Sequence, residues 1–270
     1  MPQYAARSPL IFVLRLGTAG AAWATWISEA VVCLLFVYQL KRRQPLFGGF
    51  PFFSRLKKHY AWHIVRLGMP VALLNSFFAV INLLMGRAAS TYGGHIGLMT
   101  LTAGGQMEAI AWNTSQGFST ALSAFTAQNF AARKSERIQK AYALTLQMTM
   151  LIGAFVTLLF VFWGSEVFSV IVPEQAAYEA GGVFLRIDGY SMILMMVEIS
   201  TQGVFYGIGR TLPPALISIA FNIIRIPLAN GLAAGGLGVE GVWWAISLSS
   251  MLKGVVIYVW YKFLIFAAKV

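Results

Sequence analysis

The run AYALTLQMTMLIGAFVTLLFVFWGS, Ala141–Ser165, contains no charged residue. A helix needs about 20 predominantly apolar residues to cross about 30 Å of hydrocarbon, so this run is long enough to span a membrane. Two further charge-free runs, Leu67–Gly86 and Ala109–Ala132, have the same property. The sequence therefore predicts a chain of transmembrane helices.

The composition supports this interpretation over the whole chain. Hydrophobic residues make up 58% and charged residues 11%, with a mean hydropathy of +0.71, which is far from the composition of soluble domains. The predicted fold class is all-α, a polytopic transmembrane helical bundle. Four more stretches are predicted to span, each with few charges: Gly20–Leu40, Val183–Ile208, Pro213–Ala234 and Val239–Tyr261.

The net charge of +11 is distributed as membrane topology requires. Positions 41–66 hold seven basic residues and no acidic one, and the next basic cluster, 133–140, comes two predicted helices later. Lys and Arg concentrate in the cytoplasmic loops of membrane proteins. We therefore expect a multi-pass protein of the plasma (inner) membrane with cytoplasmic basic loops and C-terminus, rather than a nucleic-acid-binding protein.

The chain also contains an internal repeat. LGTAGAAWATWIS at Leu16–Ser28 and LGVEGVWWAISLS at Leu237–Ser249 share six of thirteen residues. A first unit that matches the second would lie mostly before Met1, so we expect a truncated two-lobed protein. The predicted parts are a first-lobe remnant at 1–44, a cytoplasmic basic interfacial linker at 45–64 and a second six-helix lobe at 65–270.

Four motifs, in this order and spacing, resemble those of the MATE family of multidrug efflux transporters: RLGMP (Arg66–Pro70), AFTAQNFAARKSERI (Ala124–Ile138), YGIGRTLPP (Tyr206–Pro214) and GLGVEGVWWA (Gly236–Ala245). The resemblance implies twelve helices in two six-helix lobes. This chain would then carry the sixth helix and the whole second lobe. It also implies transport of organic cations and no enzymatic activity.

Ionisable residues inside predicted spans are the candidate site. Each costs several kcal/mol in lipid, about 3 at a helix centre, unless it faces a cavity or a partner. Glu198 and Glu108 fall near the middle of the membrane and can exchange a proton or bind Na⁺; the alternative is that they are packing elements. Glu29 is a weaker candidate because its repeat partner is Ser250. Neighbouring amides could supply further oxygens: Asn75, Asn82, Asn113, Gln116 and Asn222.

Three more charged residues are candidate partners. We expect the Arg225 guanidinium to bind a carbonyl that Pro227 frees, or to pair with a carboxylate. Lys253 either pairs with a carboxylate or extends its ammonium to the membrane surface. Asp188, close to Arg186, is expected to form a surface pair or to line an outer cavity.

Two groups of uncharged residues accompany these charges. Met192, Met195 and Met196 either pack between helices, which we favour, or offer a soft surface to flat organic cations. Gly203, Gly207 and Gly209 are expected to permit close helix contact and a loose helix end.

The predicted function is cation-coupled antiport, in which H⁺ or Na⁺ drives export of organic cations by alternating access. No GxxxxGK[ST] motif occurs, so ion gradients are the expected energy source, and no cofactor is expected. The expected partners are membrane lipid, small organic cations and a missing first lobe. Two alternatives stay open: a lipid or lipid-linked oligosaccharide flippase of the same superfamily, and an inactive membrane fragment.

Overall fold

The structure is a computed structural model that describes residues 17–43 and 58–268. It divides into two compact units, Met1–Lys58 and His59–Val270. The predicted linker, apart from its last seven residues, lies outside the described residues. The predicted boundaries at 44 and 64 stay a prediction.

The described part of the first unit is one helix, α2 (Gly17–Arg43), which contains the predicted span Gly20–Leu40. Its apolar part, Trp26–Gln39, is shorter than the spans of the second unit. Glu29 lies on an exposed face of this helix. The role of Glu29 stays a prediction.

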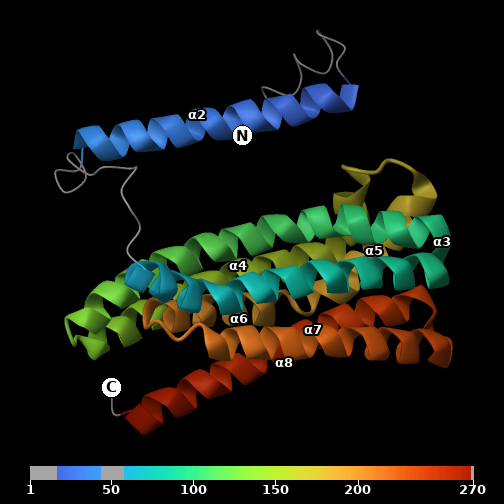
Figure 1. Cartoon of the computed structure of the whole chain (residues 1–270). Helices are drawn as coiled ribbons and strands as arrows, with labels where there is room; N and C mark the ends of the chain where they lie inside the picture. The colour runs from blue at the N-terminus through green and yellow to red at the C-terminus, as the bar shows by residue number, and fades with distance from the viewer. Residues whose placement is uncertain (1–16, 44–57, 269–270) are drawn as a thin grey trace. The chain divides into compact units, whose positions relative to one another are not determined.

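The second unit is a helical bundle, and Figure 1 shows its long helices running alongside one another. Four helices among the described residues are long and apolar enough to cross a membrane, or five if a bent pair counts as one span. These observations confirm the predicted all-α fold of apolar helices. In chain order the elements are α3 (Lys58–Ala131), α4 (Ser135–Ser169), α5 (Gln175–Gly189), α6 (Met192–Gly207), α7 (Leu212–Leu232), the short π-helix η2 (Ala233–Leu237) and α8 (Val239–Ala268).

The long α3 is two helices joined at Gly94. This residue has φ 59° and ψ −147°, a backbone conformation that glycine adopts without steric cost. The break separates the predicted spans Leu67–Gly86 and Ala109–Ala132, as the polar, glycine-containing sequence between them indicates.

The prediction of one unbroken span over Val183–Ile208 is wrong. The structure has two helices there, α5 and α6, bent by 52°. Two of the carbonyls at the bend accept hydrogen bonds from neighbouring helices. Thr157 Oγ1 donates to the Gly189 oxygen at 2.8 Å, and Ser247 Oγ donates to the Ile187 oxygen at 2.9 Å. Hydroxyls from α4 and α8 therefore satisfy backbone groups that a bend leaves free.

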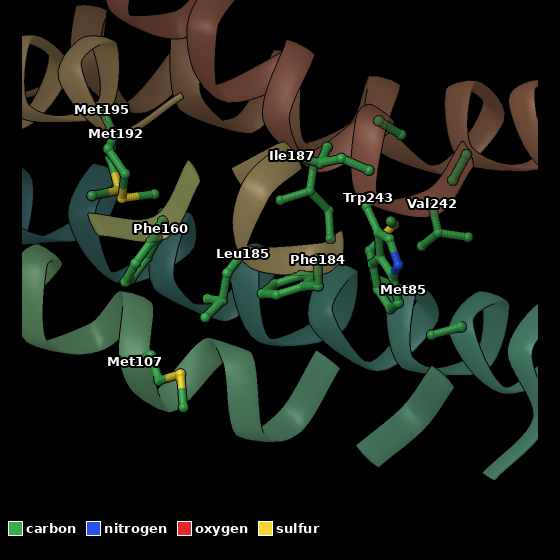
Figure 2. Close-up of a cluster of buried hydrophobic side chains, with 14 of the residues drawn as sticks. Met85, Met107, Phe160, Phe184, Leu185, Ile187, Met192, Met195, Val242 and Trp243 are labelled. Atoms are coloured by element: carbon green, nitrogen blue, oxygen red, sulfur yellow. The ribbon is translucent and has the colours of Figure 1, made fainter. Parts of the chain in front are cut away.

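The apolar core lies where α3, α4, α5, α6 and α8 meet (Figure 2). The rings of Phe184 and Trp243 meet edge to face, with centroids 4.9 Å apart. Met192, Met195 and Met196 are all buried in this cluster. The prediction that these methionines pack between helices is therefore confirmed.

Glycines bring α6 close to α3. A Cβ atom on Gly203 would lie 2.6 Å from the Ser119 backbone oxygen, and one on Gly207 would lie 2.6 Å from that of Ser123. No real side chain tolerates such contacts, which confirms the predicted role of both glycines. This close approach fixes the position of α6, which carries Glu198.

Candidate functional site

A polar seam of buried side chains lies among α6, α7 and α8. Members three or four positions apart share one face of their helix, as Glu198 and Gln202 do, and Ser249 lies directly beside Ser250. The seam consists of Glu198 and Gln202 on α6, Ser218, Asn222 and Arg225 on α7, and Ser249, Ser250 and Lys253 on α8.

Glu198 is at the centre of the seam and is 4% exposed. Its Oε1 atom accepts hydrogen bonds from Gln202 Nε2 and from Ser218 Oγ, both at 3.0 Å. Tyr206 OH donates in turn to Gln202 Oε1 at 3.3 Å. Gln202 and Ser218 therefore hold one carboxylate oxygen of Glu198 in place. The Tyr206 hydroxyl, about one turn further along α6, orients the side-chain amide of Gln202.

Lys253 holds the other oxygen. Its Nζ atom lies 3.3 Å from Glu198 Oε2, and the lysine is 7% exposed. Of the two alternatives left open for Lys253, the structure has the carboxylate partner and not the extension toward the membrane surface. A buried pair of this kind offsets the cost of removing each charge from water only while both partners are present.

Arg225 is 5% exposed and binds two hydroxyls of α8. Its Nε donates to Ser249 Oγ at 2.6 Å, and one terminal nitrogen donates to Ser250 Oγ at 2.8 Å. The predicted carbonyl or carboxylate partner was wrong, because consecutive serines of the facing helix present hydroxyls to the guanidinium. Arg225 thus joins α7 to α8, consistent with the scaffold role that we favoured.

Asp188 differs from the expected surface residue. It is 2% exposed, and neither carboxylate oxygen has a hydrogen-bond partner within the described residues. It lies at the end of α5 beside the bend, and the charges of Glu108 and Arg225 are near enough to act on it. The predicted surface pair with Arg186 is therefore corrected, because Asp188 lies on the face of α5 that packs into the bundle, whereas Arg186 is exposed.

Glu108 lies on the second half of α3 and is partly exposed. Its charge interacts with those of Arg225 and Lys253. It is thus close to the polar seam without being one of its hydrogen-bonded members.

The predicted amides are divided between two settings. Asn222 is 2% exposed in the polar seam, and its Oδ1 atom has no hydrogen-bond partner in the described part of the chain. Asn75 and Asn82 lie on exposed faces of α3, and Gln116 is half-buried there. The structure therefore brings Asn222 to the helices that hold Glu198 and leaves Asn75 and Asn82 at the surface of their unit.

Sequence reasoning missed several members of the site. Gln202 and Tyr206 follow Glu198 at intervals of four residues, and this spacing could have identified them. Ser218 precedes Asn222 by four residues in the same way. Ser249 and Ser250 carried no comparable signal, because nothing local in the sequence indicates that they face Arg225.

The carboxylate of Glu198 can bind a single positive charge. Among residues 17–43 and 58–268, no group of three His, Cys, Asp or Glu side chains is placed to hold a metal ion. Glu198 presents one carboxylate to one ammonium in a region from which water is excluded. Such a charge interacts strongly with any cation that reaches it, because the local dielectric is low.

Comparison with known proteins gives the family of this chain. The MatE family model matches residues 70–230, which is more than half of the chain. The probable multidrug resistance protein YoeA of Bacillus subtilis is 25% identical over 257 residues, covering 92% of this chain and 55% of that protein. The probable multidrug resistance protein NorM of Thermotoga maritima is 24% identical, covering 84% of this chain and 49% of that protein.

Solved structures agree on the fold. A crystal structure of MATE in the straight conformation matches with a TM-score of 0.89 and 22% identity, over 99% of this chain and 61% of that one. A MOP superfamily transporter from Pyrococcus furiosus matches with a TM-score of 0.86 and 21% identity, over 100% and 61%. The chain spans about half the length of the curated relatives it matches. Members of this family are membrane transporters rather than enzymes, and the chain belongs to the MatE family.

Proposed function

We propose that this chain forms the cation-exchanging lobe of an antiporter that exports small organic cations against H⁺ or Na⁺. The curated relatives are named as probable multidrug resistance proteins, which supports small organic substrates. The organic-cation class rests on the chemistry of the site. A buried carboxylate attracts cations and repels anions.

The observation that carries the proposal is the Glu198–Lys253 pair. Within an apolar bundle, a glutamate and a lysine, both more than nine-tenths buried, lie 3.3 Å apart. Hydrophobic residues of similar volume would often be as stable or more stable at such a place, so packing alone gives little reason for the pair. Ionisable residues inside membrane segments serve mainly in ion and substrate pathways.

Exchange follows if two ligands compete for this carboxylate. A coupling ion and an organic cation cannot both hold Glu198 favourably, so each leaves when the other binds. Coupling to a gradient then requires that the two ligands stabilise opposite-facing states of the transporter differently. We propose that a first lobe, which corresponds to the additional length of the relatives, completes the pathway.

The proposed setting is the plasma (inner) membrane, surrounded by lipid, with the C-terminus in the cytoplasm. The clustering of Lys and Arg in alternate connections supports this orientation.

The flippase alternative receives less support from the site. A lipid pyrophosphate would require several free and accessible cations, whereas Lys253 is paired with Glu198 and Arg225 is only 5% exposed.

The test is flux of a fluorescent organic cation in proteoliposomes under an imposed pH or Na⁺ gradient, with and without a supplied first lobe. The wild-type chain with that lobe is expected to exchange, and Glu198→Gln is expected to abolish exchange while the protein still inserts. Retained wild-type flux in the variant would refute the assignment of Glu198.

The matched control is Glu166→Gln, which changes an exposed glutamate of α4 in the same way. It should leave the flux unchanged. Flux lost in both variants would indicate a general effect of neutralising acidic residues rather than a role for Glu198.

A further inference from the structure

Lys253 already lies where a cation bound to Glu198 would lie. Its Nζ atom is 3.3 Å from Glu198 Oε2, and this is the only ion pair of Glu198 among the described residues. An ammonium is chemically the same kind of group that an organic amine would present. The site therefore contains a positive charge that belongs to the protein itself.

The remaining surroundings of Glu198 offer no second place for a cation. Oε1 accepts hydrogen bonds from Gln202 and Ser218, and the carboxylate is only 4% exposed. Oε2 is the oxygen that accepts no hydrogen bond from a neutral side chain, and Lys253 holds it. A cation that takes this position displaces the lysine.

Lys253 is also subject to the charge of a second carboxylate. The charges of Lys253 and Glu108 attract each other, while that of Arg225 repels Lys253. Glu108 makes no hydrogen bond or ion pair that the described contacts record, and it is partly exposed. Lysine carries its charge on a flexible four-carbon side chain, which allows the ammonium to move away from Glu198.

We propose that Lys253 is a tethered competitor for the cation-binding carboxylate, which an incoming monovalent cation displaces from Glu198. This inference rests on the proposed function of Glu198. It adds the residue that sets the affinity of Glu198 for cations. Because the lysine returns whenever the cation leaves, Glu198 is never left as an unpaired buried charge. The competitor also keeps cation affinity low enough for release.

The experiment measures binding of tetraphenylphosphonium to the purified full chain by calorimetry. Lys253→Met is expected to tighten binding about tenfold or more, because close charge pairs have coupling energies above about 1.5 kcal/mol. Lys262→Met is the matched control, since Lys262 is an exposed lysine of the same helix. This variant should bind tetraphenylphosphonium with the affinity of the wild type. Unchanged or weaker binding to folded Lys253→Met overturns the inference.

A second variant and a second readout cover loss of folding. Lys253→Gln retains a hydrogen-bond donor for Oε2 and should also tighten binding. In the wild type with ¹³Cε-labelled lysine, the Lys253 signal, assigned by its loss in Lys253→Arg, should shift when tetraphenylphosphonium saturates the chain. A signal that does not shift overturns the inference.

Glu198→Gln separates this inference from the proposed function. If Glu198→Gln binds tetraphenylphosphonium as the wild type does, Glu198 is not the cation site and both ideas fail. If Glu198→Gln loses binding but the Lys253 variants bind as the wild type does, only the tethered competitor is refuted.

Discussion

Two buried carboxylates of this protein, Glu198 and Asp188, have almost equal exposure and very different partners. Glu198 is 4% exposed and Asp188 is 2% exposed. Glu198 has Gln202 and Ser218 on one oxygen and Lys253 on the other. Asp188 has no hydrogen-bond partner for either oxygen in the described part of the chain.

The difference shows that burial alone does not define a site. A charge taken out of water is costly, and a partner of opposite charge offsets that cost only in good geometry. The partners of Glu198 come from α6, α7 and α8, so three helices of the bundle supply its hydrogen bonds and its counter-charge. Asp188 has no such arrangement, and it lies on the face of α5 that packs into the bundle.

The largest expected difference in stability is between two variants that each neutralise one of these carboxylates. Glu198→Gln leaves Lys253 buried without a counter-charge and should lower the free energy of unfolding by about 3 kcal/mol. Asp188→Asn removes no ion pair of the described structure and should not lower the free energy of unfolding, because a buried carboxylate without a partner is itself costly. Denaturant unfolding of both variants in the same detergent measures the difference. Equal losses would show that the two carboxylates are not distinguished by their partners.

A smaller effect is expected from Ser218→Ala. This change removes one of the two donors to Glu198 Oε1 and keeps the ion pair, so it should cost about 1 kcal/mol. Ser76→Ala is a suitable control, because Ser76 is exposed and binds only a carbonyl of its own helix. An equal effect of both variants would show that the Ser218 hydrogen bond does not support Glu198.

The smallest effect is expected from Tyr206→Phe. The hydroxyl donates to Gln202 at 3.3 Å and acts on Glu198 only through that amide. Its loss should cost about 0.5 kcal/mol in stability and leave the ion pair intact. A cost above that of Ser218→Ala would mean that Tyr206 supports the carboxylate more directly than its contact indicates.

The helices of the second unit could be predicted because their signal is local. Charge-free runs such as Ala141–Ser165 are long enough to span, and the structure places this run within α4. The bend between α5 and α6 could not be predicted from 183–208. The hydroxyls that satisfy its carbonyls, Thr157 and Ser247, come from helices distant in the sequence.

The site shows the same division between local and distant information. Charges inside apolar spans identified Glu198 and Lys253 as candidates, because such charges require a partner or a cavity. The sequence did not indicate that they pair, since they are 55 positions apart on different helices. The burial of Asp188 was likewise unpredicted, because it depends on how α5 packs into the bundle.

The central claim is that the Glu198–Lys253 charge pair carries cation exchange. Its most direct test is the flux of the double variant Glu198→Gln/Lys253→Met in proteoliposomes with the supplied first lobe. This variant removes both charges together and so leaves neither buried without a partner. The account predicts a stably folded protein whose gradient-driven exchange is lost. A double variant that exchanges organic cations at the wild-type rate would contradict the account.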